Sequence, residues 1–383
     1  MKVVVVTHDK EPVNGMELYR LHYPYFYGLS DNYIGEITIK RMTYGYILEN
    51  THEVLTDDVY VFSRLQSLEV AEKIITANKK LVIDIDDYWL VSLEHALRNT
   101  EENKEYVKII TKTLSMAHLV TCTTKILAER IKTELDIDAV VIKNTIPDAP
   151  THFSGNKFKH TKVRFGWIGG VHHIEDIKLI KDSFAKLHSD ISIKNKYQIC
   201  LGGFNADKNN PFYFQYEKIM TDNYKPFINA DKSYFNYLSL FVPQLEHIGF
   251  NKSYRRIWNK PITEYGQMYR DLDVAIIPLT SISQNGNKNI FNSCKSELKL
   301  VEAGTTNKAI IISNVEPYSQ HLIHEENCLS VGQSQNWYTH IRRLINDKDL
   351  RKELADNLTT YVKIHFNHRG ETLKLFNALK KLV

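Results

Sequence analysis

The sequence predicts an α/β protein built from two doubly wound domains, each with a parallel sheet. Its 383 residues, at roughly 150 residues per domain, leave room for two cores. Short β-rich runs alternate with helix-length stretches, which is typical of βαβ units. The composition, 43% hydrophobic and 25% charged, is that of an ordinary folded protein and excludes disordered, collagen-like and coiled-coil classes.

The first domain is expected over residues 1–157. Its strands are predicted at 2–7, 59–63, 81–85, 119–122 and 139–142. A polar stretch that contains Pro and Gly, 144–160, then interrupts the alternation and marks the domain boundary.

The second domain is expected over residues 158–365. Its strands are predicted at 163–168, 197–201, 274–278, 309–313 and 328–331. Beyond it, Leu373, Phe376 and Leu379 recur at helical spacing within 366–383. We expect this last helix to pack back on the first domain, although peripheral contact with an anionic membrane is an alternative.

Charge and cysteine usage exclude several classes of protein. A formal net charge of +4 is too small to indicate nucleic acid or anionic lipid as a partner. The four cysteines show no CxxC spacing, so neither a zinc site nor a disulfide framework is predicted, and a cytoplasmic location fits best. No apolar run approaches the roughly 18 residues that cross a bilayer, and the first strand does not resemble a signal peptide.

The most informative segment for chemistry runs from 291 to 313 and reads FNSCKSELKLVEAGTTNKAIIIS. Ser296 is expected to cap a helix that ends at Gly304, which places Lys295, Lys299 and Glu302 on one side. Two cations at a helix N-terminus suit an anion, and a carboxylate one turn later can accept bonds from a diol. A nucleoside diphosphate offers both groups, a diphosphate for the lysines and ribose hydroxyls for Glu302. The alternative interpretation is a surface helix with Lys–Glu pairing.

A second phosphate-binding signal follows the first strand of the second domain. Gly169 and Gly170 stand between an apolar strand and a helical stretch, so their amides can approach a phosphate closely. His172 and His173 lie on the same turn and can hydrogen-bond to the donor or its diphosphate. A plain tight turn with solvated histidines is the alternative.

The stretch 295–317, with KSELKLVEAG, an apolar strand and then Glu316-Pro317, resembles the nucleotide-sugar helix and next strand of the retaining family 4 glycosyltransferases of GT-B fold. Other segments agree with that family in the same order. They are 58–64, 81–89, 117–131, 141–147, 165–170 and 265–279.

The resemblance implies two Rossmann-like domains that face a central cleft. It also implies transfer of a sugar, hexosyltransferase-like, from a nucleoside-diphosphate sugar to a hydroxyl acceptor, with retention of configuration. The second domain would hold the donor, and the first domain would hold the acceptor. The commonest acceptor in the family is a saccharide in glycan assembly. No metal or other cofactor is expected.

Residue by residue, Glu302 matches the second carboxylate of the family's E-x7-E pair, the one directed at the ribose. The first carboxylate would fall at Cys294, so this sequence departs from the pattern and the sugar contact there must come from Lys295 or from backbone amides. The usual Arg and Lys after the first strand of the second domain are also missing. We therefore expect Lys295 and Lys299 to stabilise the leaving diphosphate.

In the first domain, the resemblance places a glycine loop over the donor phosphates, here at Gly15. Arg20 follows on the next helix. Two interpretations stay open for Arg20: contact with donor or acceptor, or pairing with a carboxylate.

Three aspartates, Asp84, Asp86 and Asp87, end a buried strand, where side chains reach the crevice in which ligands bind. Three interpretations compete. The cluster is a metal-binding DxD of a GT-A transferase; or Asp86 or Asp87 orients or deprotonates the acceptor hydroxyl; or it is structural and pairs with an arginine such as Arg64. The GT-B segments argue against the metal.

Three rival functions remain at this stage, one of which is a nucleotide-sugar epimerase of the same fold that would act without any acceptor. A degenerate member that binds nucleotide sugar without turnover would follow from the missing first carboxylate. A transferase that glycosylates modified DNA bases would show steeply salt-dependent duplex binding, which the small net charge disfavours without excluding nucleic acid as a partner. Nucleophile-elbow, Walker, HExxH and GxGxxG motifs do not occur, so the commonest hydrolases and NAD-dependent enzymes are excluded.

Overall fold

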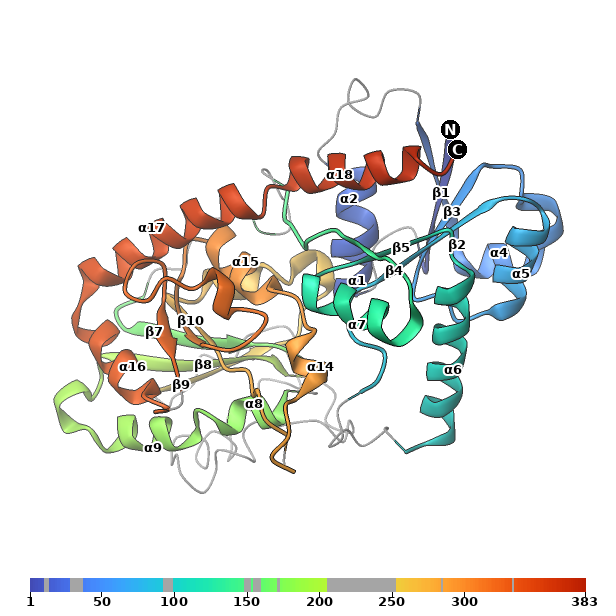
Figure 1. The fold of residues 1–383 in the computed structure, drawn as a ribbon. Helices are drawn as coiled ribbons and strands as arrows, with labels where there is room; N and C mark the ends of the chain where they lie inside the picture. Colours follow the sequence, from blue (N-terminus) through green and yellow to red (C-terminus); the bar gives the residue numbers. More distant parts are fainter. Residues whose placement is uncertain are drawn as a thin grey trace, which may run out of the picture. The chain divides into compact units, whose positions relative to one another are not determined.

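The computed structural model comprises two compact units (Figure 1). Unit 1 consists of Met1–Pro150, Ser281–Leu298 and His365–Val383, and unit 2 consists of Thr151–Thr280 and Lys299–Ile364. The residues that the structure describes are 1–9, 14–27, 37–91, 99–147, 153, 160–170, 173–204, 253–283, 285–332 and 334–383.

Unit 1 is built on a six-stranded sheet with the order β2-β1-β3-β4-β5-β6, in which all neighbouring strands are parallel. The strands are β1 (Lys2–Thr7), β2 (Thr38–Thr43), β3 (Val59–Ser63), β4 (Lys80–Ile85), β5 (Leu119–Cys122) and β6 (Val140–Val141). Central strands of a parallel sheet are covered on both faces, which is why β1, β3 and β4 are nearly continuous runs of buried apolar residues.

The helices of unit 1 are positioned by short polar caps. They are α1 (Gly15–Glu17), η1 (Leu18–His22), α2 (Tyr23–Phe26), α4 (Tyr44–Val54), α5 (Leu68–Thr76), α6 (Glu101–Met116), α7 (Lys125–Leu135), α14 (Ile290–Ser293) and α18 (His368–Lys380). The hydroxyls of Ser67, Thr100 and Thr124 accept a backbone N–H in the first turn of α5, α6 and α7 respectively. Each cap satisfies a donor that the helix itself leaves unpaired.

The last helix, α18, contributes to the core of unit 1. Leu375, Phe376 and Leu379 are buried in one cluster with Val3 and Val5 of β1. Because the apolar side of α18 is covered by its own unit, the chain ends beside its own first strand (Figure 1). No helix within the described part of the chain is long and apolar enough to cross a membrane.

Unit 2 repeats the architecture with the strand order β12-β11-β10-β7-β8-β9, again parallel throughout. The strands are β7 (Val163–Ile168), β8 (Tyr197–Phe204), β9 (Tyr254–Trp258), β10 (Val274–Ile277), β11 (Ala309–Ser313) and β12 (Leu329–Val331). The helices are α8 (Ile174–Lys178), α9 (Lys181–Ser189), η3 (Ile191–Ile193), η4 (Ile262–Glu264), α13 (Gln267–Arg270), α15 (Leu298–Thr305), η5 (Ser319–His321), α16 (Trp337–Asn346) and α17 (Lys348–His365).

The predicted α/β class with two doubly wound parallel sheets is confirmed. All ten strands predicted from apolar runs are present within a few residues of their expected bounds. Two strands were not predicted: β2, an edge strand of alternating exposure, and β9, which carries the buried Arg255 and Arg256. Neither has the apolar run on which the prediction relied.

Two further details differ from the sequence-based expectations. Gly304 lies one residue before the end of α15 at Thr305. An added Cβ there would lie 2.4 Å from a methyl carbon of Val362, so the glycine permits close packing of α15 on α17. The segment Ser281–Leu298, which the sequence analysis includes in 158–365, groups with unit 1 because Cys294 is buried in that unit's core.

Candidate functional site

The carboxyl ends of β7 and β10 form the topological switch point of unit 2. The chain passes from β7 to β8 and β9 on one side of the sheet and returns to β10 on the other side. Ligands of doubly wound folds bind outside the carboxyl ends of strands at such a point. Gly169 and Gly170, which directly follow β7, therefore stand where the sheet favours a ligand.

Lys299 of α15 reaches this loop. Its ammonium group donates a hydrogen bond to the carbonyl of Ile168 and lies 5.4 Å from the centre of the Trp167 ring. A Cβ added to Gly169 would lie 2.5 Å from Cζ2 of Trp167 and 3.0 Å from Nζ of Lys299. Only glycine fits against the indole at this position. The structure therefore places two of the predicted residues, Gly169 and Lys299, side by side.

The backbone around Gly169 is packed too closely for any larger residue. Gly203, at the end of β8, has a φ of +97°, and its Cβ would lie 2.1 Å from the carbonyl oxygen of Gly169. By contrast, no described atom lies within 4 Å of the place that a Cβ would take at Gly170. The loop is therefore fixed at Gly169 and open at Gly170.

Glu302, one turn after Lys299, is buried and accepts a hydrogen bond of 2.8 Å from the hydroxyl of Tyr269. Burial, together with the negative charge of Glu302, raises the pKa of Tyr269 well above its ordinary value, so the phenol stays protonated as the donor. The predicted ribose contact of Glu302 stays a prediction, and it requires this carboxylate to turn toward a ligand or to share its oxygens.

A buried carboxylate stands behind the same loop. Asp176 of α8 has one oxygen 2.7 Å from Nδ1 of His173, and its other oxygen accepts the backbone N–H of Thr280 at 2.8 Å. His173 was predicted from the sequence and Asp176 was not; the spacing of three residues between them is the signal that would have identified the pair. His172 lies outside the described residues.

Cys294 and Lys295 belong to unit 1, whereas Lys299 and Glu302 belong to unit 2. Cys294 is fully buried in the hydrophobic core of unit 1, and burial raises the pKa of its thiol to about 11. The ammonium of Lys295 lies 5.3 Å from the ring of Phe291. The joint role expected for Lys295 and Lys299 at a diphosphate stays a prediction.

Asp86 and Asp87 follow β4 and share one arginine. Nη2 of Arg64 lies 2.6 Å from a carboxylate oxygen of Asp86 and 3.4 Å from one of Asp87. Arg64 takes up a left-handed backbone conformation, with φ 51°, to do so. Burial and the charge of Asp86 raise the pKa of Asp87, while Arg64 and Lys295 oppose the shift.

Arg20 is buried and pairs with a carboxylate, which is one of its two predicted interpretations. Its guanidinium makes two hydrogen bonds to Asp84, of 2.6 and 2.9 Å, and a third of 2.6 Å to the carbonyl of Ile142. Asp84 also accepts the hydroxyl of Thr121 at 2.6 Å. The network ties η1 to the ends of β4, β5 and β6, a structural role.

Gly15 is the first residue of α1 in unit 1. The side chain of Asn14 caps this helix by accepting the N–H of Glu17, and the buried Glu17 carboxylate lies 2.6 Å from Nδ1 of His8. The predicted position of Gly15 over donor phosphates stays a prediction.

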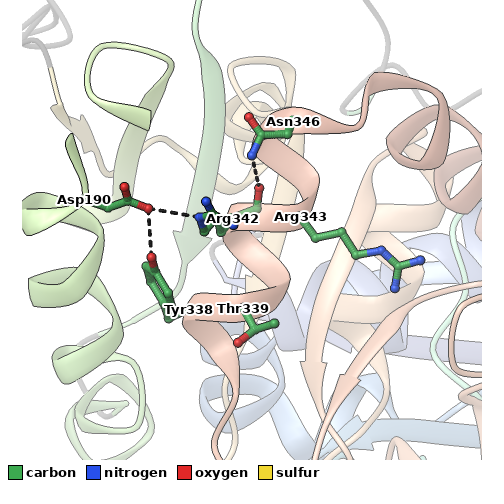
Figure 2. Close-up of a pocket in the computed structure, with 6 residues that line it drawn as sticks. All are labelled: Asp190, Tyr338, Thr339, Arg342, Arg343 and Asn346. Atoms are coloured by element: carbon green, nitrogen blue, oxygen red, sulfur yellow. Dashed lines mark hydrogen bonds and ion pairs between the residues drawn. The ribbon is translucent and has the colours of Figure 1, made fainter. Parts of the chain in front are cut away.

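An open pocket of about 480 Å³ lies elsewhere in unit 2 (Figure 2). Asp190 there accepts hydrogen bonds from the hydroxyl of Tyr338, at 2.8 Å, and from Nε of Arg342, at 3.1 Å. The pocket is also lined by Thr339, Arg343 and Asn346. None of the residues predicted for the site lines this pocket.

Within the described residues, no group of three or more His, Cys, Asp or Glu is arranged so that it could hold a metal ion. Asp84, Asp86 and Asp87 are instead directed at Arg20 and Arg64.

No family model and no curated protein sequence matches the chain. Solved structures do match it over its full length. Sucrose-phosphate synthase from Thermosynechococcus elongatus superposes with a TM-score of 0.66 at 10% identity, covering 100% of this chain and 98% of that one. Anabaena Alr3699/HepE in complex with UDP-glucose gives a TM-score of 0.60 at 13% identity and covers 100% of both chains.

A glycosyltransferase from Rickettsia africae gives a TM-score of 0.60 at 10% identity, covering 100% of this chain and 98% of that one. Together with the two six-stranded parallel sheets, these matches show the GT-B fold that the sequence predicts. Membership of family 4 stays a prediction.

Proposed function

We propose that this GT-B protein is a glycosyltransferase that moves a sugar from a nucleoside-diphosphate sugar to a hydroxyl acceptor. The observation that carries the proposal is the meeting of Lys299 with Gly169 at the switch point of unit 2. A cation beside a glycine loop that is open at Gly170 suits a diphosphate. HepE, which is similar in fold, has been solved with UDP and with UDP-glucose, which supports a donor of this class.

In this proposal Lys299 neutralises the diphosphate as it leaves, and Lys295 adds further positive charge. Glu302 holds the ribose hydroxyls, and Tyr269, its present donor, fixes the carboxylate until the nucleotide arrives. Transfer proceeds with retention and without a metal. The acceptor is a saccharide, and the chain acts in the cytoplasm in glycan assembly.

Asp87 is the better placed of the two aspartates to receive the acceptor proton. Its raised pKa makes it a stronger base than an ordinary aspartate, and its side chain is 34% exposed against 19% for Asp86. Asp86, which takes the shorter contacts with Arg64, holds the arginine in place.

A second candidate function is binding of nucleotide sugar without transfer. The observation that favours it is Cys294, which stands where the family keeps its first carboxylate and is fully buried in an apolar core. A buried thiol cannot replace a carboxylate that contacts a sugar.

The two functions are separated by measuring binding and turnover on the same protein. Melting temperatures are recorded with UDP, GDP, ADP and CMP, with and without Mg²⁺, because a ligand that binds only the folded state raises the melting temperature. Release of the diphosphate from the matching nucleotide sugar is then assayed with and without saccharide acceptors. Binding without release selects the second function, and no shift with any nucleotide rejects both.

A further inference from the structure

Asp176 joins the two strand ends that form the switch point of unit 2. Its Oδ1 accepts the N–H of Thr280, just beyond β10, and its Oδ2 lies 2.7 Å from Nδ1 of His173, just beyond the loop that follows β7. The residue is 3% exposed. A carboxylate is costly to bury unless both oxygens are hydrogen-bonded, so both contacts are needed to keep it there.

The contact with Asp176 decides how the ring of His173 carries its protons. An ionised carboxylate only accepts hydrogen bonds, so Nδ1 of His173 bears a proton. Nε2 is then an acceptor in the neutral ring and a donor in the imidazolium. A buried carboxylate on Nδ1 both orients the imidazole and stabilises its protonated form, as in catalytic triads.

Trp167 places this ring beside the predicted phosphate-binding residues. The indole is contacted by the ring of His173, at 5.8 Å between centroids and 68° between planes, and by the ammonium of Lys299 at 5.4 Å. Gly169 lies against the same indole. One buried aromatic side chain therefore organises His173, Lys299 and the glycine loop.

We propose that His173 is a diphosphate-binding residue and that Asp176 is its positioning residue. The imidazolium donates Nε2–H to a phosphate oxygen of the ligand, while Lys299 balances the remaining charge. The proton stays on Nε2, and no covalent step is assigned to the pair. The identification of the ligand as the diphosphate of a sugar donor rests on the proposed function. The existence of an anion site at His173 does not depend on it.

The test uses calorimetric titration of the full-length chain with inorganic pyrophosphate, and in parallel with UDP and GDP. We expect His173→Ala to weaken pyrophosphate binding about tenfold or more, because a charge-assisted hydrogen bond is lost. His173→Gln, which keeps a neutral N–H donor but not the positive charge, should bind pyrophosphate more tightly than His173→Ala and more weakly than the wild type. Asp176→Asn should bind pyrophosphate more weakly than the wild type and more tightly than His173→Ala.

Asp190→Asn is the matched control, because Asp190 is also a hydrogen-bonded aspartate of unit 2 but lines the separate pocket of Figure 2. It should leave pyrophosphate binding unchanged. Circular dichroism shows whether each variant is folded. If Asp176→Asn does not fold, His173→Ala and His173→Gln still test the proposal.

The inference is overturned if the wild type does not bind pyrophosphate, if His173→Ala binds it as well as the wild type, or if His173→Gln is as weak as His173→Ala. If pyrophosphate binding depends on His173 but no nucleoside diphosphate binds, the proposed function fails and the anion site stands. If UDP or GDP binds independently of His173, the proposed function stands and this inference fails.

Discussion

The two units place charge at the ends of their strands in different ways. In unit 1 the carboxylates that end β4 face arginines, with Arg20 on Asp84 and Arg64 on Asp86 and Asp87. In unit 2 Lys299 is held by a backbone carbonyl and an indole beside a loop of glycines. The first arrangement ties strands together, whereas the second brings a cation to backbone that a ligand can approach.

The comparison teaches that residue type alone does not identify a site. Arg20 and Lys299 are both cations for which the sequence allows contact with a ligand, yet Arg20 donates to four protein oxygens from three residues, Asp84, Ile142 and Asn144. What distinguishes the candidate site in unit 2 is close-packed glycine backbone at the switch point, which leaves Gly170 open.

The largest expected effect comes from breaking the network of unit 1. Arg20→Met should lower the free energy of unfolding by about 3–5 kcal/mol, because it leaves the Asp84 carboxylate buried without its partner. Urea unfolding followed by circular dichroism measures the loss. Lys132→Met, which removes exposed pairs with Asp136 and Asp138, is the control and should leave stability almost unchanged. Equal effects of the two substitutions would contradict the structural role of Arg20.

Next come the glycines of unit 2. Gly203→Ala should cost about 1–3 kcal/mol of stability, because φ is positive and the new Cβ would meet the carbonyl of Gly169. Gly170→Ala should be close to neutral for stability, since its Cβ meets no described atom. If Gly170 faces the ligand, its methyl group should instead reduce affinity for UDP or GDP in calorimetric titration. A Gly203→Ala protein of wild-type stability would show that the loop is looser than described.

Lys299→Met should weaken binding of the nucleoside diphosphate by about tenfold, or 1.4 kcal/mol, while affecting the free nucleoside little. The ratio of the two affinities is the measurement, since a general loss of structure would lower both. Lys178→Met removes a lysine of unit 2 that pairs with Glu175 on the surface, and it should leave the ratio unchanged. An unchanged ratio in Lys299→Met would remove Lys299 from the diphosphate site.

The smallest effect concerns Asp87 and pH. Because its pKa is raised in the folded state, the native protein binds more protons than the unfolded chain between the ordinary and raised pKa values. The contribution of Asp87 to stability therefore falls as the pH rises through that window. Melting temperatures of the wild type and Asp87→Asn, compared from pH 4 to pH 7, should diverge in favour of the variant as the pH increases. Divergence in the opposite direction would mean that the Arg64 pairing dominates over burial.

The fold class and most of the strands follow from local sequence patterns. Buried parallel strands are continuous apolar runs, so β1, β3, β7 and β11 were predictable from local composition. The sequence also indicated Gly169 and Lys299, since a glycine pair after a strand and a lysine on an amphipathic helix are local signals.

The contacts between polar groups, by contrast, depend on how distant segments of the chain fold together. β9 was missed because two arginines interrupt its apolar pattern, and their burial depends on partners such as Asp271, which lies 2.8 Å from Arg255. Likewise the contacts of Asp176 with His173 and Thr280 require strand β10 to return beside β7. Such pairings join residues up to 104 positions apart, and local periodicity carries no information about them.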